Sequence, residues 1–214
     1  MAGRMTETVY IVDDDASFAR GLARVVSAAG WKAEVCRSAD EFLAPGRVVA
    51  GEPGCVLLDV RMPGMRGPEL QRVMIERGIR LPVIFLTGHG DVGTSVDAMK
   101  RGAVDFLEKP VRAEQLAAAI RVALERDRVE RARGHELREI ETRIARLSPR
   151  EREVMGHVVA GRLNKQIAAD LNISLKTVKA HRAKVMEKMD VRSVPALVDL
   201  CRTAGVGVQA VSGD

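Results

Sequence analysis

The chain has 214 residues, of which 46% are hydrophobic and 29% are charged, and its formal net charge is +5. This length is ample for two domains that each bury a core, and the absence of any run of about 18 apolar residues excludes a helical membrane span. Lys and Arg balance Asp and Glu at 18 each up to Arg128, but number 16 against 11 beyond it. The cationic last third predicts a polyanionic partner, although a solvated basic face is equally consistent with it.

Three cysteines, Cys36, Cys55 and Cys201, form an odd set without the spacing of a metal site. Two of them stand in apolar runs, as small buried residues do. The first residues carry no long apolar stretch after their charges. The sequence therefore favours a reducing compartment, and we expect a cytoplasmic protein that does not associate with a membrane.

The first half alternates short apolar runs with segments of helical spacing. Five strands are expected, at residues 9–12, 33–36, 55–58, 83–86 and 104–107. Helices are expected at residues 17–29, 38–43, 68–77, 92–100 and 113–125. This alternation is typical of an α/β domain in which a five-stranded, doubly wound parallel sheet of the flavodoxin-like kind carries helices on both faces.

Ionisable residues follow three of the expected strands at the point where each strand ends. Asp13 and Asp14 follow the first strand, Asp59 follows the third and Lys109 follows the fifth. Because the carboxyl ends of parallel strands meet at one crevice, these side chains should lie together. Crowded carboxylates repel one another unless a divalent cation lies among them, and oxygen ligands suit Mg²⁺. The cluster therefore predicts a Mg²⁺ site.

Asp59 is the expected nucleophile of this site. A carboxylate can hold a phosphoryl group as an acyl phosphate when a metal and a cation screen the incoming charge. We expect Lys109 to supply that cation and Thr87, at the end of the fourth strand, to hydrogen-bond a phosphoryl oxygen. Asp15 should instead lie at the start of the following helix, where a carboxylate interacts favourably with the helix dipole. Taken alone, Asp59 and Thr87 are ordinary strand-end residues, and only the joint pattern favours a phosphoacceptor site.

On these residues, segment 6–127 resembles a response-regulator receiver domain. The matching positions are Asp13, Asp14, Asp59, Thr87 and Lys109. The resemblance implies that a partner sensor histidine kinase phosphorylates Asp59, and that Thr87 and Phe106 shift inward when phosphate arrives. The peptide bond before Pro110 is usually cis in such domains.

The resemblance also implies how the metal is held. Mg²⁺ would be bound by Asp14, Asp59 and the backbone carbonyl of Arg61. Asp13 would act mainly through water.

Residues 128–146 are expected to form a helical linker. The segment 113–147 is rich in charge and poor in helix breakers, which indicates one long helix or two helices meeting at Gly134. Asp127 and Arg131 are four residues apart and could pair on an exposed face. A narrow apolar stripe recurs at helical spacing, formed by Leu137, Ile140, Ile144 and Leu147. This stripe is too short to establish a coiled coil, and it could equally pack on the next domain.

The segment 147–206 is expected to be an all-α domain. It opens on a helix-start pattern, with Ser148 as the cap, Pro149 in the first helical position and Glu151 three residues after the cap. Four helices are expected, at residues 149–160, 164–171, 175–189 and 194–204. Short helices joined by tight turns are typical of a helix-turn-helix arrangement. Residues 207–214 are expected to be a flexible tail.

The third of these helices carries the candidate DNA-binding face. Helical spacing directs Val178, Val185 and Met189 inward. The outward residues are then Lys176, Lys179, Ala180, Ala183 and Lys184. Cations beside small residues suit close approach to a major groove, although a solvated lysine face is an equal alternative.

The same segment resembles the LuxR-type DNA-binding domain. The resemblance is carried by the runs Leu147-Ser148-Pro149-Arg150-Glu151, Asn164-Lys165-Gln166-Ile167-Ala168 and Thr177-Val178-Lys179-Ala180-His181. Joined to a receiver, it makes the chain similar to the FixJ/NarL class of response regulators. The resemblance implies binding to double-stranded promoter DNA, with bases faced by Lys179, Ala180 and Ala183 and the backbone held by Lys165, Thr177 and Lys184. It also implies a dimer contact by Leu197, Val198 and Cys201 on the last helix.

The sequence thus predicts a transcriptional regulator rather than an enzyme. Phosphorylation of Asp59 would convert it into a DNA-binding homodimer that contacts RNA polymerase, and the chain would slowly remove its own phosphate. One rival is an aspartyl-phosphate phosphatase, but such enzymes usually carry a second acid where this chain has Arg61. The other rival is a DNA-binding protein whose receiver serves only for protein contacts.

Overall fold

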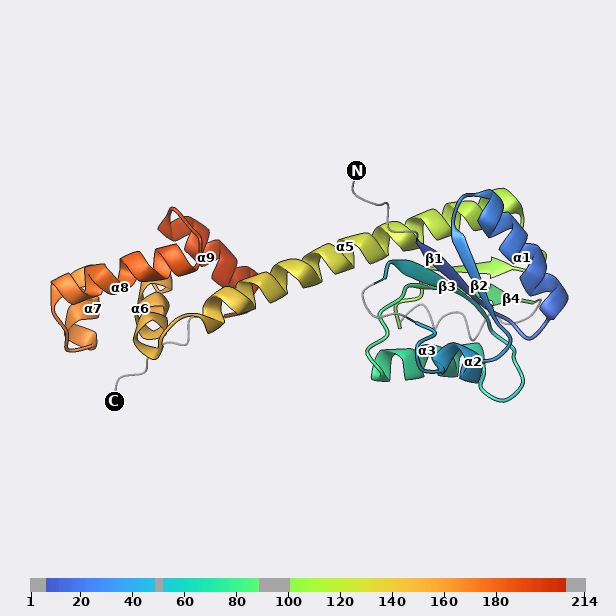
Figure 1. The fold of residues 1–214 in the computed structure, drawn as a ribbon, viewed down its shortest axis with the longest axis horizontal. Helices are drawn as coiled ribbons and strands as arrows, with labels where there is room; N and C mark the ends of the chain where they lie inside the picture. Colours follow the sequence, from blue (N-terminus) through green and yellow to red (C-terminus); the bar gives the residue numbers. More distant parts are fainter. Residues whose placement is uncertain (1–6, 49–51, 89–100, 207–214) are drawn as a thin grey trace. The chain divides into compact units, whose positions relative to one another are not determined.

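A computed structural model describes residues 7–48, 52–88 and 101–206, which belong to two compact units, Met1–Arg131 and Ala132–Asp214. The first unit holds a sheet and the second is helical (Figure 1). The helix expected at residues 92–100 lies outside the described residues. Among the helices that the structure describes, none combines the length and the apolar composition needed to cross a bilayer.

Five parallel strands form the sheet of the first unit, in the order β2-β1-β3-β4-β5. They are β1 (Thr8–Val12), β2 (Lys32–Cys36), β3 (Gly54–Asp59), β4 (Val83–Thr87) and β5 (Asp105–Glu108). Each contains or overlaps its expected strand, so the doubly wound parallel sheet is confirmed. The winding reverses between β1 and β3, and the crevice at such a switch point is where open α/β sheets bind ligands.

Helices cover both faces of this sheet, because successive residues of each strand point to opposite sides and both sides are apolar. The helices of the first unit are α1 (Ala16–Ala28), α2 (Ala39–Leu43), α3 (Gly67–Glu76) and the first part of α5 (Ala113–Ala145). Side chains of α2 and α3 share one core with Tyr10 and Val56, whereas α1 and α5 share the other with Ile11 and Leu57. Figure 1 shows α2 and α3 together on one side of the sheet and α1 on the other.

Gly67, the first residue of α3, lies against the backbone of the strand end that carries Asp59. A Cβ atom at Gly67 would lie 2.2 Å from the Asp59 carbonyl oxygen and 3.2 Å from Phe85 Cε1. We therefore expect Gly67→Ala to lower the free energy of unfolding by about 2 kcal/mol, because the backbone must move to admit the methyl group. Gly21→Ala is the matched control: its Cβ would meet no atom within 4 Å, so urea unfolding should show it unchanged or slightly stabilised. Equal stability of the two variants would contradict this.

The second unit is a bundle built on the end of α5. Its other helices are α6 (Pro149–Val159), α7 (Asn164–Asp170), α8 (Leu175–Lys188) and α9 (Val194–Thr203). Each overlaps its expected helix, and α5 is one continuous helix that passes through Gly134 without a break. Ile140 and Leu147 of the apolar stripe are buried in the core of this bundle, and Ile144 packs against it. These three residues of the stripe therefore pack on the helix-turn-helix domain.

Asp127 and Arg131 pair as expected, but not on an exposed face. Arg131 Nε donates to Asp127 Oδ2 at 2.6 Å, and the Asp127 side chain is only 3% exposed. The same carboxylate oxygen accepts the backbone N–H of Gly54 at 3.0 Å. Asp127 is therefore a buried charge that ties α5 to the start of β3, and spacing along the helix did not reveal this.

Ser148 and Glu151 form the expected capping box at the start of α6. Glu151 also accepts a hydrogen bond from Lys188 Nζ at 2.6 Å, although its own side chain is only 5% exposed. This bond from Lys188, followed by that from the backbone N–H of Ser148, lowers the pKa of Glu151 from 4.5 to about 2.

The lowered pKa of Glu151 makes the second unit sensitive to acid. A carboxyl with a depressed folded-state pKa stabilises fully above pH 4.5 and loses that contribution as the pH falls towards 2. Glu151→Gln should lower the stability of the second unit at pH 7 by about 1–2 kcal/mol. Between pH 4.5 and 2, the variant should also lose less stability than the wild type does. Amide hydrogen exchange in α6 and α8 measures this. Glu153→Gln, which changes an exposed partner of Arg150, should leave both values unchanged.

Candidate functional site

Four ionisable side chains meet at the carboxyl end of the sheet. Asp13 follows β1, Asp59 ends β3 and Lys109 follows β5, so the parallel strands deliver them to one edge. Lys109 Nζ lies 2.7 Å from Asp13 Oδ2 and 3.2 Å from Asp59 Oδ1. Asp13, Asp14 and Asp59 each bring a carboxylate oxygen within 4.8 Å of the others. Three carboxylates at this spacing suit a hard divalent cation such as Mg²⁺.

The charges of Asp59 and Lys109 affect each other. Burial raises the pKa of Asp59 and nearby Asp13 adds to this, whereas Lys109 and the backbone N–H of Arg61 oppose it without reversing it. Burial also opposes the charge on Lys109, but the hydrogen bond from its ammonium to Asp13 and the attraction of both carboxylates raise its pKa overall. Lys109 therefore remains a cation at neutral pH, next to an Asp59 side chain that is only 10% exposed.

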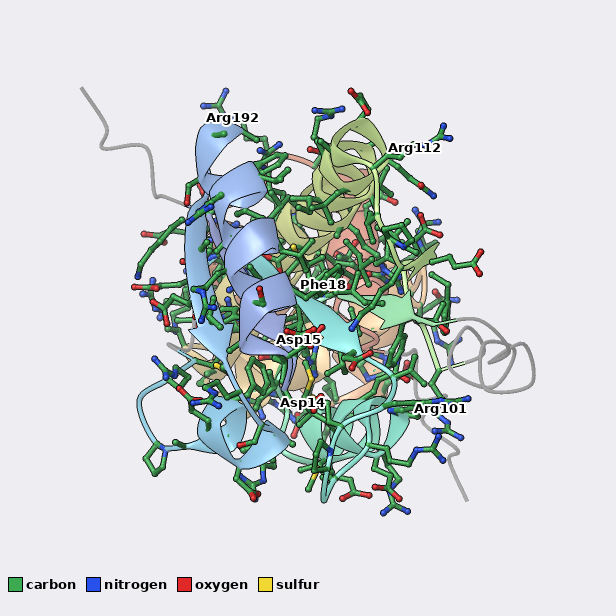
Figure 2. All side chains as sticks on the ribbon, turned by 90° about the vertical axis from the view of Figure 1, so that its right-hand side faces the viewer. Asp14, Asp15, Phe18, Arg101, Arg112 and Arg192 are labelled. Carbon is green, nitrogen blue, oxygen red and sulfur yellow. The ribbon has the colours of Figure 1, made fainter. Side chains whose placement is uncertain are left out.

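The Asp15 side chain caps α1 and is not one of the three acids of the cluster. Its Oδ1 accepts the backbone N–H groups of Phe18 at 3.1 Å and Ser17 at 2.8 Å, and these bonds, that from Phe18 first, lower its pKa. Its own backbone N–H donates to Asp13 Oδ1 at 2.9 Å and thereby orients that carboxylate. Figure 2 shows Asp14, Asp15 and Phe18 grouped at this end of the first unit. The expectation that Asp15 opens the helix is confirmed.

Phe18 is a neighbour of the site that the sequence did not indicate. Lys109 Nζ lies over the Phe18 ring, 4.5 Å from its centroid, which is a cation–π distance. The position of Phe18 in the first turn of α1, four residues after Asp14, is the one sequence signal that could have singled it out. The peptide bond from Lys109 to Pro110 is cis, as the resemblance implied.

The two expected switch residues lie on neighbouring strands. Thr87 ends β4, and its hydroxyl donates to the carbonyl of Gly88 at 3.0 Å. Phe106 of β5 is partly buried and stacks on Phe85, with ring centroids 4.9 Å apart and planes 20° apart. Thr87 therefore stands on the strand next to the one that ends in Asp59, and Phe106 stands on the edge strand beyond it.

Helix α8, the third of the four helices expected in this domain, has one buried face and one cationic face. Val178, Val185 and Met189 are buried in the core, as expected. The exposed residues of α8 include Lys176, Lys179, Ala180, Ala183 and Lys184. Lys165 is exposed on α7, whereas Thr177 is partly buried and its hydroxyl bonds that of Ser174, the cap of α8, at 2.7 Å. Arg182 of α8 donates to Asn164 of α7, which fixes the two helices of the turn against each other.

The expected dimer residues require a correction. Leu197 and Cys201 are 0% and 1% exposed and form part of the core of their own bundle, so they offer no surface to a second chain. Helix α9 packs on α6, and Leu197 and Cys201 belong to the same core as Val154 of α6. Val198 is partly exposed and remains a candidate contact.

Comparison with known protein families agrees with the architecture of both units. Residues 9–121 match the family described as response regulator receiver domain, and residues 145–201 match the family described as bacterial regulatory proteins, luxR family. The chain belongs to the response regulators of two-component systems that join a receiver to a LuxR-type DNA-binding domain, and within them to the FixJ/NarL class.

Individual relatives resemble the chain over most of its length. The transcriptional regulatory protein FixJ of Azorhizobium caulinodans is 45% identical over 199 residues, which cover 92% of this chain and 93% of that protein. The response regulator protein TodT of Pseudomonas putida is 43% identical over 190 residues, or 89% of this chain and 83% of that protein. Among solved structures, the response regulator StyR aligns with a TM-score of 0.83 and 38% identity, covering 92% of this chain and 98% of that one.

Proposed function

We propose that Asp59 accepts a phosphoryl group from a sensor histidine kinase, and that this switches on promoter binding by a homodimer in the cytoplasm. The observation that carries the proposal is the poorly solvated Asp59 carboxylate, which lies beside Asp13, Asp14 and the Lys109 ammonium. An acceptor carboxylate needs cationic neighbours because the arriving group brings more negative charge.

In the proposed transfer, an Asp59 carboxylate oxygen attacks phosphorus. With acetyl phosphate as donor, the bond from phosphorus to the bridging oxygen breaks, and acetate leaves with the electron pair. Lys109 neutralises a phosphoryl oxygen, and the Arg61 backbone N–H holds the attacking carboxylate in place. Asp14, Asp59 and the Arg61 carbonyl would bind Mg²⁺ directly and Asp13 through water. The bound metal supplies electrostatic screening of the transferring group.

The proposed switch begins with the added charge on Asp59. A phosphoryl group there draws Lys109 and the Thr87 hydroxyl towards it. Phe106 then moves into the space that Thr87 leaves, and the receiver surface adopts its dimer-forming arrangement. To change the population from mostly inactive to mostly active, phosphorylation must stabilise the active arrangement by about 5.5 kcal/mol relative to the inactive one. The dimer, with Val198 among its contacts, would bind DNA and recruit RNA polymerase, and the acyl phosphate would hydrolyse slowly.

The proposed DNA contacts lie on α7 and α8. Lys179, Ala180 and Ala183 would face base edges in the major groove. Lys165, Thr177 and Lys184 would hold the phosphate backbone.

Labelling with a small phosphodonor tests the proposed function. The full-length chain is incubated with acetyl phosphate and Mg²⁺, and intact mass and peptide mapping locate the adduct. We expect one hydroxylamine-sensitive phosphate on Asp59, a higher dimer fraction and tighter binding to a duplex selected by the phosphorylated chain. An unlabelled chain, or a labelled one with unchanged DNA affinity, would refute the proposal.

Two lysines of α8 should affect DNA binding differently. Lys184→Ala should weaken binding to any duplex and reduce the slope of log affinity against log salt by about one, because one phosphate contact is lost. Lys179→Ala should instead relax the preference at one base pair by about 1–3 kcal/mol. Fluorescence anisotropy with the selected duplex and its single-base variants separates the two effects. Lys32→Ala, an exposed lysine of the first unit, should change neither.

A further inference from the structure

We propose that Phe18 is a positioning residue for phosphoryl transfer, because its ring holds the Lys109 ammonium beside Asp59. The inference rests on the proposed function of Asp59. Lys109 Nζ lies 2.7 Å from Asp13 Oδ2, 3.2 Å from Asp59 Oδ1 and 4.5 Å from the centroid of the Phe18 ring. The face of an aromatic ring carries the negative part of its quadrupole and attracts an ammonium group.

The Phe18 ring is well placed to restrain a mobile side chain. Lysine ends in a compact charge on a flexible four-carbon stem, and the Lys109 side chain is 21% exposed, so solvent is within its reach. Phe18 is comparatively fixed: its backbone N–H donates to Asp15 at 3.1 Å, and its side chain packs against the core between the sheet and α1. A rigid ring beneath the ammonium therefore narrows the orientations that Lys109 can adopt.

The ring becomes more important when the site binds a metal. Asp13 and Asp59 are the anionic partners of Lys109, and the same two carboxylates belong to the acid cluster that suits Mg²⁺. Any charge that they share with a divalent ion weakens their hold on the ammonium. Mg²⁺ prefers oxygen ligands, so it does not compete for the Phe18 ring. Phe18 thus keeps the ammonium at the site in the state in which phosphoryl transfer takes place.

The test compares Phe18→Leu, which keeps an apolar side chain but removes the ring, with Phe18→Tyr, which keeps the ring. At saturating Mg²⁺, Phe18→Leu should label Asp59 from acetyl phosphate about tenfold more slowly, whereas Phe18→Tyr should remain close to wild type. The Mg²⁺ concentration that gives half the maximal rate should be unchanged in both, because the acids are untouched. Phe42→Leu is the matched control: it removes a buried ring from the opposite core and should leave the rate unchanged.

A second measurement does not depend on phosphorylation of Asp59. In the metal-free protein, NMR of lysine labelled with carbon-13 should show a ring-current shift at the Lys109 ε-methylene, which Phe18→Leu abolishes and Phe18→Tyr preserves. Absence of this shift in wild type would overturn the inference, as would equal labelling rates for wild type and Phe18→Leu. If wild type shows the shift but takes up no phosphate, the proposed function of Asp59 fails while the contact stands.

Discussion

Asp59→Asn is expected to abolish phosphoryl uptake and the rise in DNA affinity that depends on it. The amide keeps the volume of the carboxylate but is not a nucleophile towards phosphorus, so the acyl phosphate cannot form. Intact mass after treatment with acetyl phosphate and Mg²⁺ should show no adduct. DNA anisotropy should give the same affinity with and without the donor.

The same substitution has a predictable effect on stability. Because burial raises the pKa of Asp59, its ionisation destabilises the folded state; this penalty is absent below pH 3.8 and present at neutral pH. Asp59→Asn should therefore be more stable than wild type in urea at pH 7 without Mg²⁺, and the difference should vanish in acid. Asp105→Asn, at the opposite end of β5, should leave labelling intact. Normal labelling of Asp59→Asn would show that another residue accepts the phosphate.

Asp127→Ala should lower the stability of the first unit by about 3 kcal/mol. The substitution leaves the buried N–H of Gly54 and the Arg131 guanidinium without their acceptor. Urea unfolding followed by fluorescence of Trp31, the only tryptophan in the chain, reports on this unit.

Glu125→Ala is the matched control for Asp127→Ala. Glu125 stands half a turn away on the same helix and pairs with Arg128, but both side chains are largely exposed. Its removal should cost less than about 1 kcal/mol, as is usual for a surface ion pair. Similar losses for the two variants would show that the Asp127 contacts contribute little.

Much of the architecture could be predicted because short apolar runs fix where strands begin and end. Asp13, Asp59 and Lys109 come together simply because parallel strands point the same way, so strand assignment was enough to place them. Burial that depends on neighbours distant in sequence was not predictable in this way. Asp127 looked like half of an exposed helical pair, and the Gly54 amide that it accepts lies 73 positions earlier in the chain.

The residues that sequence reasoning misplaced or missed share this dependence on packing. Leu197 and Cys201 lie on an apolar helix face, and a helical pattern cannot tell whether such a face meets its own domain or a second chain. In the sequence, Phe18 cannot be distinguished from the other apolar residues of α1. Its contact with Lys109 requires the turn after β5 to lie next to the first turn of α1, and this is a property of the folded sheet.

The three consecutive aspartates after β1 have different roles, and this determines the net charge of the site. Asp15 caps α1, whereas Asp13, Asp14 and Asp59 form the acid cluster beside the ammonium of Lys109. Three ionised carboxylates and one ammonium would give this cluster a net charge of −2. One divalent ion brings that balance to zero. Under the proposed function, a dianionic donor would then approach a formally neutral site, whereas a third inward acid from the same triplet would leave a residual repulsion during transfer.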